Sequence, residues 1–444
     1  MKVVRNVLIV LAISILPFVV AEVLLRYIYP DKANDISVHE PGDAAYRFDE
    51  DYLVALKPNA SKTFTRSGIN GGQVINWKTN SDGFRGPELR KDPEFRIIVY
   101  GDSNIQAVFS ELESTYVFRL EKYLKEWGIK GVEVLNAGVV GFGPDQSLLR
   151  FEREADKYKP DLVIFHIFAD NDFGDIVRNR LVEIDKKGKL VKTGHKREMD
   201  ECLTRRSDSN GGNFISSLLI TRAANKLVKA LSGGETKEPK VENGEEKGRL
   251  LAEKTLLILH NVPRRRLDNI SEEELREMVI EELIKTSGEE YEVYKKSGPQ
   301  KFSHCSDHYD IDIALDSGEE SAHVKIELME SVLKRAKEFA DSRDILFLVV
   351  IQPSIIDMTL DNEDVLGYGY LEGYPGYDRR NLTAAVKNAC ASNGIEYLNL
   401  FDIFVESDPP NLYFKKDDNH WNDRGQDEAA RATAQYIEKY MFSR

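Results

Sequence analysis

The chain has few residues that could cross-link it, with only three cysteines, Cys202, Cys305 and Cys390, among 444 residues. This number is too small for a disulfide framework. No block of Lys and Arg supplies a basic face either, and the 75 acidic residues outnumber the 61 basic ones to give a net charge of -14. Because a generic nucleic-acid-binding protein needs a basic face, we expect no nucleic-acid partner.

Long apolar runs are absent except near the N-terminus. Residues 7–25 contain a single charged residue, Glu22, and the run approaches the ~20 residues that span a bilayer. Lys2 and Arg5 precede it, which favours a cytoplasmic N-terminus and an exported catalytic body. We predict a single-pass membrane anchor over residues 1–29. A cleaved signal peptide is the alternative, although the run contains only a loose match to a cleavage site.

The remainder of the chain is mixed enough to be soluble and apolar enough to build a core, with 41% hydrophobic and 31% charged residues. Its length fits one large domain with insertions, or two domains. A stretch rich in Gly, Glu and Lys over residues 232–248 is predicted to be disordered. Composition and pattern divide the chain into five parts. They are an anchor (1–29), a stalk with flanking strands (30–92), a first core part (93–175), an insertion or cap (176–320) and a second core part (321–444).

Short apolar runs alternate with helical patterns in both core parts. The runs are typical of strands buried on both faces, and we expect strands over 95–100, 132–136, 162–168, 345–351 and 395–400. Apolar residues at helical spacing predict helices between or after these strands, over 114–127, 145–158, 324–339, 380–393 and 424–442. This alternation predicts an α/β fold, a three-layer doubly wound parallel sheet with helices on both faces.

Candidate catalytic residues follow the predicted strands or precede the last helix. Ligands of open parallel sheets bind beyond the carboxyl ends of the strands, so these residues can meet at one edge. A serine hydroxyl needs a base to become nucleophilic, and an imidazole does this best when a carboxylate orients it. We therefore expect Ser103 to be the nucleophile, His420 its general base and Asp417 the orienting carboxylate.

Four sequence blocks occur in the order of a known family. They are Gly-Asp-Ser at 101–103, Asn-x-Gly-x-x-Gly at 136–141, Asn-Asp at 171–172 and Asp-x-x-His at 417–420. On these blocks the chain resembles the SGNH (GDSL-type) hydrolases over 93–175 and 321–444. Residues 79–86 resemble the lead-in of membrane-anchored members associated with exopolysaccharide acylation. The resemblance does not extend over 176–320.

The resemblance implies a flavodoxin-like SGNH hydrolase fold and a Ser-His-Asp triad that needs neither a cofactor nor a metal. It implies an oxyanion hole made by the backbone N–H groups of Ser103 and Gly141 and the side-chain amide of Asn171. One departure is Ala169, where the family usually has glycine, and a methyl group there is expected to narrow the acyl pocket.

Three functions are compatible with the resemblance. The first is an esterase that removes an acyl group, with acetyl favoured, from a carbohydrate or small ester. The second is an O-acyltransferase that works with exopolysaccharide machinery at the membrane. The third is an inactive anchored binding protein, against which the joint presence of Ser103, Asn171, Asp417 and His420 argues.

Each assignment has a structural alternative. Ser103 can be a helix N-cap, Gly141 a turn glycine, Asn171 a loop cap and His420 a surface residue. Asp418 competes with Asp417 for the orienting role.

Other reactive residues are expected to be structural. His166 lies within an apolar run and is expected to be a core residue with a hydrogen-bond partner. Cys305 and His308 have a spacing that binds zinc, but no second pair matches it, and Cys305 can instead pair with Cys202. Cys390 is expected to be a buried free thiol.

Overall fold

The computed structural model describes residues 45–194, 249, 252–253, 256, 266–267, 270–296, 309–360, 366–415 and 419–442. Several predictions fall outside these residues: the anchor over 1–29, the disorder of 232–248, and the roles of Cys202, Cys305, His308, Asp417 and Asp418. No helix within the described ranges has the length and apolar character needed to cross a bilayer.

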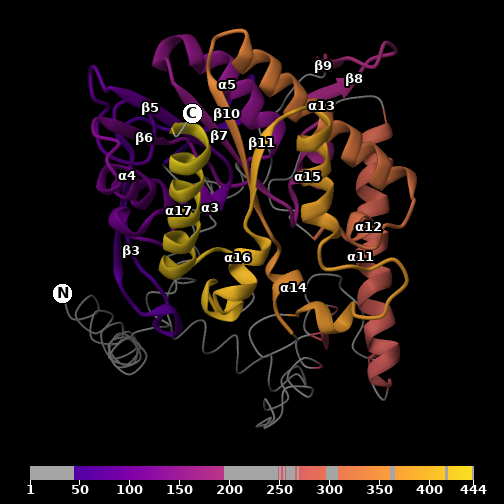
Figure 1. Cartoon of the computed structure of the whole chain (residues 1–444). Coiled ribbons are helices and arrows are strands. Elements are labelled where there is room, and N and C mark those ends of the chain that lie inside the picture. Colours follow the sequence, from indigo (N-terminus) through magenta and orange to yellow (C-terminus); the bar gives the residue numbers. More distant parts are fainter. Residues whose placement is uncertain are drawn as a thin grey trace, which may run out of the picture.

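A five-stranded parallel sheet forms the centre of the molecule (Figure 1). Its spatial order is β6-β5-β7-β10-β11, with bounds Val132–Asn136, Phe95–Tyr100, Leu162–Phe168, Leu346–Gln352 and Glu396–Asn399. The strand expectations are confirmed to within about a residue at each end, and the parallel sheet is confirmed.

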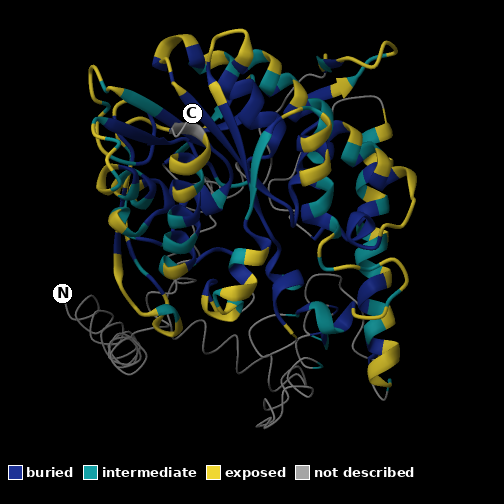
Figure 2. Cartoon of the chain, viewed as in Figure 1, coloured by how far each residue is buried: buried dark blue, intermediate teal, exposed yellow. Residues whose placement is uncertain are grey.

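Helices cover both faces of this sheet, which confirms the three-layer arrangement (Figure 1). One face carries α4 (Tyr116–Glu126), α16 (Phe401–Glu406) and α17 (Asp423–Ile437). The other carries α5 (Pro144–Tyr158), α13 (Glu320–Asp341) and α15 (Asn381–Ser392). Strands β5, β6, β7 and β10 are buried almost throughout, whereas these helices expose their outer sides (Figure 2).

The two cores follow from alternation along each strand. In β5, Ile98 and Tyr100 point into the α5 and α13 side, whereas Ile97 and Val99 point into the α4 and α17 side. Successive side chains of a strand point to opposite faces, so the part of a strand that is covered on both sides is apolar at successive positions. This is why β5 is apolar from Ile97 to Tyr100, whereas its charged residue, Arg96, lies in the less buried start of the strand.

Smaller elements surround the sheet. Two hairpins precede it, β1 (Tyr46–Asp49) with β2 (Leu53–Leu56) and β3 (Ser61–Thr65) with β4 (Val74–Lys78). The remaining elements are α3 (Ser103–Gln106), α6 (Asp172–Asn179), β8 (Val182–Ile184), β9 (Leu190–Lys192), α11 (Glu272–Lys295), α12 (Ile311–Ala314), α14 (Ile355–Met358), and the short 3₁₀ or π turns Gly68–Asn70, Leu112–Ser114, Tyr368–Tyr370, Pro409–Asn411 and Glu438–Phe442.

The described parts of 176–320 pack on the core. Ile280 of α11 and Ile311 of α12 belong to the same apolar cluster as α13, and a capping box of Ser271 and Glu274 starts α11. The proposed division of the chain into core parts and insertion stays a prediction.

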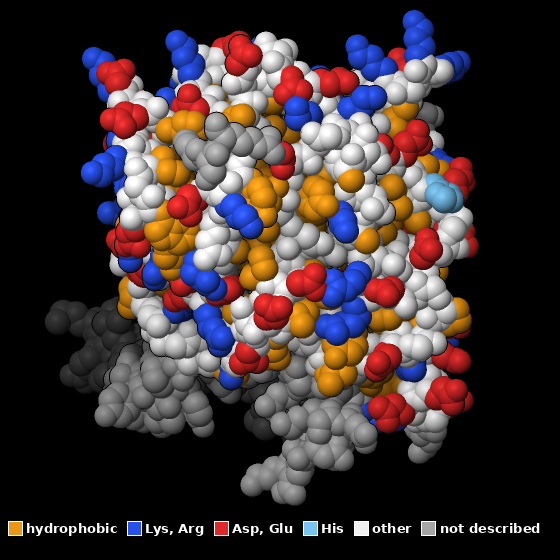
Figure 3. Space-filling model, viewed as in Figure 1, with side chains coloured by type: hydrophobic (Ala, Val, Ile, Leu, Met, Phe, Trp, Pro, Cys, Tyr) orange, Lys and Arg blue, Asp and Glu red, His pale blue; other side chains and the backbone are white. Residues whose placement is uncertain are grey.

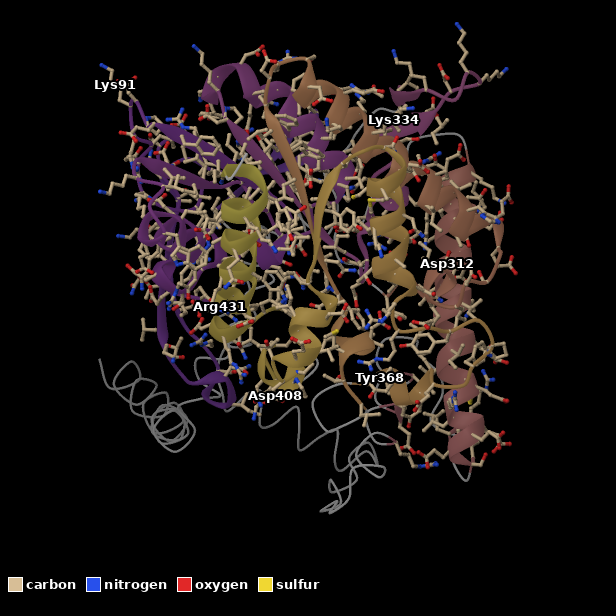
Figure 4. All side chains as sticks on the ribbon, viewed as in Figure 1. Lys91, Asp312, Lys334, Tyr368, Asp408 and Arg431 are labelled. Carbon is tan, nitrogen blue, oxygen red and sulfur yellow. The ribbon has the colours of Figure 1, made fainter. Side chains whose placement is uncertain are left out.

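The carboxyl edge of the sheet lies on the lower side of the view in Figure 4, where α14 and α16 follow β10 and β11. Asp408 and Tyr368 are labelled on that side, and Lys91, which precedes β5, lies on the opposite side. Acidic and basic side chains are intermixed over the face shown in Figure 3.

Asp145 at the start of α5 should make stability fall as pH rises. Its side chain is fully buried, and burial, with a smaller contribution from Asp175, raises its pKa from 3.8 to about 8. Between these values the unfolded chain has released a proton that the folded chain keeps, so folding loses about 1.4 kcal/mol per pH unit from this group. Asp145→Asn removes the titration and keeps an acceptor for the Asn179 amide, which donates to Asp145 Oδ1 at 2.8 Å.

We therefore expect urea unfolding of Asp145→Asn to show a smaller loss of stability between pH 5 and pH 8 than the parent shows. Identical pH dependence in the two proteins would contradict a buried, protonated Asp145.

Candidate active site

Ser103 lies on a sharp turn between β5 and α3. Asp102 is the N-cap of α3, and its side chain accepts a hydrogen bond from the backbone N–H of Asn104. Ser103 is therefore the first helical residue, and the alternative that Ser103 itself caps the helix is wrong. Ser103 is only partly buried.

His420 lies within hydrogen-bond distance of this serine. Its Nε2 is 2.7 Å from Ser103 Oγ, although the two residues are 317 positions apart in the sequence. The imidazole is 8% exposed, so the alternative of a surface histidine is wrong. The ring of Phe109 packs edge-to-face against it, with ring centres 5.5 Å apart. The structure thus brings Ser103 and His420 into contact.

Asn104 joins the two segments, a role that the sequence did not reveal. Its buried Oδ1 accepts a hydrogen bond from the backbone N–H of Trp421 at 3.0 Å, and its carbonyl accepts one from Gln426 Nε2 at 2.9 Å. Asn104 follows the nucleophile and Trp421 follows the histidine, so this bond fixes the spacing of the Ser103–His420 pair. An asparagine next to the family block carries no recognisable pattern of its own.

The loop over 136–141 packs directly against the nucleophile turn. Its Val139 N–H donates to the carbonyl of Gly101 at 3.0 Å, and Asn136 Nδ2 donates to the carbonyl of Ile105 at 2.7 Å. Gly138 comes so close to α3 that a Cβ there would lie 2.3 Å from the backbone nitrogen of Gln106. Gly141 has a φ of +71°, so it is a turn glycine, and this role is compatible with offering its N–H to a ligand.

Asn171 follows β7, the strand adjacent to β5, and is 6% exposed. It occupies the N-cap position of α6, but its side chain does not cap that helix. Asp172 accepts from the backbone N–H of Phe168 at 2.7 Å, and burial together with the charge of Asp102 raises the pKa of Asp172 well above its ordinary value. The start of α6 is therefore close to the nucleophile turn.

Charged residues behind the Asn171 loop hold it in place. Asp310 Oδ2 accepts from the backbone N–H of Gly174 at 2.9 Å, and the backbone N–H of Asp310 donates to the carbonyl of Asp170 at 2.7 Å. Lys325 then donates to Asp310 Oδ1 at 2.7 Å and to Asp312 Oδ1 at 3.2 Å, and all three side chains are almost fully buried. Figure 4 labels Asp312 on the side of the molecule where α11 and α12 lie.

Arg85, which belongs to the lead-in at 79–86, holds the other end of the nucleophile turn. Its buried guanidinium donates to the carbonyls of Gln106, Ala107 and Ser110. Burial lowers its pKa to about 9. The sequence placed these residues next to the core but did not assign Arg85 a role.

His166 and Cys390 are core residues, as expected. The pKa of His166 is lowered to about 3 by burial, so the ring is neutral. The prediction that His166 has a hydrogen-bond partner is wrong. Neither of its ring nitrogens has a hydrogen-bond partner among the described residues, and a carboxylate oxygen, Asp102 Oδ1, is 3.9 Å from Nδ1. Cys390 is a buried free thiol, and burial raises its pKa to about 12.

The site has the parts of nucleophilic catalysis by an alcohol. The Ser103 hydroxyl contacts an imidazole nitrogen that can take its proton, and Ser103 at the first position of a helix has an N–H without an intrahelical acceptor. Within the described ranges, no group of three or more His, Cys, Asp or Glu side chains is arranged to hold a metal ion.

The position of the site follows from the strand order. The chain runs from β5 outward to β6 on one side and then returns to β7 on the other, so β5 and β7 enclose the topological switch point of the sheet. Open α/β sheets bind ligands in the crevice at this point. Ser103 follows β5 and Asn171 follows β7, so both lie beside that crevice.

No family model matches the chain, and no curated protein matches it. Solved structures similar to it include the esterase EstA from Pseudoalteromonas sp., with 11% identity over 79% of this chain and 100% of that chain, and a TM-score of 0.33. An acetylxylan esterase mutant from Geobacillus stearothermophilus has 11% identity over 79% and 96%, and a TM-score of 0.35. A lipase/acylhydrolase from Enterococcus faecalis has 10% identity over 78% and 95%, and a TM-score of 0.33.

Gly138→Ala should disrupt the packing of the 136–141 loop. Its Cβ would meet the backbone of Gln106 at 2.3 Å, which cannot be relieved by a side-chain rotation. Such overpacking typically costs about 1–3 kcal/mol or more. We expect a clear drop in the thermal unfolding temperature.

Gly288→Ala is the matched control. Gly288 lies within α11, and a Cβ there would have no heavy atom within 4 Å. This substitution should stabilise the protein slightly, by up to about 1 kcal/mol, because alanine favours a helix interior. Equal effects of the two substitutions would contradict the close approach at Gly138.

Proposed function

We propose that the protein is a serine hydrolase that cleaves an acyl ester, with acetyl as the favoured acyl group, through Ser103, His420 and Asp417. The observation that carries the proposal is the 2.7 Å contact between Ser103 Oγ and His420 Nε2 at the switch point of the sheet. This is the distance that a general base needs to accept a proton from a nucleophile.

In the proposed reaction, Ser103 Oγ attacks the ester carbonyl while His420 Nε2 accepts its proton. For this step the imidazole must carry its own proton on Nδ1, and an orienting carboxylate favours that tautomer. Asp417, three residues before His420, is proposed for this role. Collapse of the tetrahedral intermediate breaks the bond to the alcohol, which leaves with the proton from His420. Water then attacks the acyl-serine with His420 again as the base.

The developing oxyanion requires donors that are fixed before the reaction. We assign this role to the backbone N–H groups of Ser103 and Gly141 and the amide of Asn171. The buried supports described above favour this assignment, because Asp310 holds the Asn171 loop and the 136–141 loop packs against α3. Loss of one such donor typically costs ~3–4 kcal/mol of transition-state stabilisation.

The substrate proposed for the site is an acylated carbohydrate or another small ester. We further propose that residues 1–29 anchor the protein in a membrane, with the catalytic body exported and working beside exopolysaccharide machinery. The apolar run at 7–25 and the preceding Lys2 and Arg5 support this location.

Ser103 should react selectively with a fluorophosphonate probe. Because activation depends on the adjacent imidazole, labelling should be lost in Ser103→Ala and reduced by at least about 100-fold in His420→Ala. Intact-mass and peptide-mass spectrometry would locate the adduct. Ser342→Ala is the control, since Ser342 is exposed and its hydroxyl donates to the carbonyl of Phe339. Absence of labelling in the folded parent over a range of pH would sink the hydrolase proposal.

The fate of the acyl group distinguishes hydrolysis from transfer. With 4-nitrophenyl acetate as donor, a hydrolase releases 4-nitrophenol at a rate that added oligosaccharide does not change, and the acetyl group appears as acetate. We expect this result. If mass spectrometry finds the acetyl group on the oligosaccharide, and Ser103→Ala abolishes it, the same residues serve an O-acyltransferase instead.

A further inference from the structure

We propose that Arg66, which lies outside the α/β core, is a positioning residue for His420. The inference rests on the proposed function, because it concerns the same Ser103–His420 pair. Arg66 directly follows β3 in the hairpin that precedes the sheet, and its side chain is 6% exposed. An arginine buried to this extent at a hairpin end needs several partners to offset its desolvation.

The first partner of Arg66 lies at the start of α17. Its Nη1 and Nη2 donate to the two carboxylate oxygens of Asp423 at 3.2 and 3.1 Å, a two-pronged ion pair. Asp423 is the first residue of α17 and lies three positions after His420. Ser110 also donates to Asp423 Oδ1 at 2.7 Å. Arg66 thereby fixes the first residue of α17, which the His420 segment directly precedes.

Two further partners contact His420 itself. Arg66 Nη1 donates to the carbonyl of Phe109 at 3.3 Å, and the ring of Phe109 packs edge-to-face on the imidazole. The guanidinium carbon lies 5.2 Å from the ring centre of Phe414, whose backbone N–H donates to the carbonyl of His420 at 3.0 Å. The Arg66 guanidinium thus contacts both Phe109, whose ring packs on the imidazole of His420, and Phe414, which holds the backbone of His420.

A second residue of the hairpin, Asn70, also contacts the segment near His420. Asn70 Oδ1 accepts from the backbone N–H of Lys415 at 2.9 Å, and Asn70 Nδ2 donates to its carbonyl at 3.4 Å. Within the hairpin, Arg66 Nε donates to Gln73 Oε1 at 2.9 Å, which orients the guanidinium plane. Lysine has no planar fork, so it cannot reproduce these contacts simultaneously.

This arrangement predicts a specific catalytic effect. Proton transfer from Ser103 requires the imidazole within hydrogen-bond reach, and a displacement of about 1 Å typically costs ~100-fold in rate. None of the Arg66 hydrogen bonds described above goes to Ser103. Its contribution therefore passes through His420 and should disappear when His420 is absent.

The test measures the rate of fluorophosphonate labelling of Ser103 in the full-length chain. We expect Arg66→Ala to slow labelling roughly 10- to 100-fold, and Arg66→Lys to give an intermediate rate, because the charge remains without the fork. In the His420→Ala background, Arg66→Ala should change the remaining rate by less than about twofold, since non-additivity is the mark of residues that act as a unit.

The matched control is Arg343→Ala. Arg343 also pairs with a carboxylate, Asp156 at 3.1 Å, and also lies over a ring, Phe339 at 3.8 Å, but it belongs to the turn between α13 and β10. It should leave labelling unchanged. If Arg66→Ala unfolds at a lower temperature than the parent, Arg66→Lys and Asn70→Ala replace it as the test variants. In each of them Ser103 should be labelled more slowly than in the parent while the protein remains folded.

Labelling of Arg66→Ala at the parent rate would overturn the inference and leave the hydrolase proposal standing. So would an equal loss in the His420→Ala background, because that result indicates a general structural role. A parent protein that fails to label would instead remove the proposed function itself.

Discussion

The site depends on one contact between distant parts of the chain, the approach of His420 Nε2 to Ser103 Oγ at 2.7 Å across 317 positions. Neither segment alone can form it. Ser103 is placed by the end of β5, and His420 by the start of α17, which packs on one face of the same sheet. A parallel sheet satisfies this requirement because every strand ends at the same edge, and the reversal of order at β5 leaves a crevice there. The fold is therefore the means by which two remote polar groups are held at hydrogen-bond distance.

Holding that distance requires more than the sheet. The segments around the site are loops, and loops are less constrained than strands unless buried polar contacts fix them. Asn104 ties the nucleophile turn to Trp421, Arg85 holds the chain after α3, and Asp310 with Lys325 holds the loop of Asn171. These groups are costly to bury singly and stabilising only when their partners are present. Their concentration behind the carboxyl edge indicates that rigidity is maintained where the chemistry would occur.

The sequence predicted the framework well and the supports poorly, for a physical reason. Strands such as β5 and β7 are buried on both faces, so nearly every residue is apolar, with Arg96 and His166 as the exceptions, and the pattern can be recognised without a structure. The positions of Ser103, Gly141 and Asn171 at strand ends follow from the same pattern. Asn104, Arg66 and the salt-bridged Lys325 left no comparable trace, because their roles depend on partners that lie far away along the chain. A hydrogen-bond partner for His166 was expected from average behaviour, whereas the ring packs against Trp421 and Tyr116 and burial keeps it neutral.

The N-terminal hairpins change how the boundary of the site is understood. The sequence predicted a stalk with strands that flank the core, and Arg66 and Asn70 in addition contact the segment on either side of His420. A catalytic base on a loop loses less entropy on reaching its working geometry if that geometry is already imposed by neighbours, which is the advantage of preorganisation. The core alone supplies one side of the His420 segment, through Asn104 and Trp421, whereas the hairpin supplies the other. The contacts that hold the Ser103–His420 pair therefore begin before β5, in the hairpin of β3 and β4.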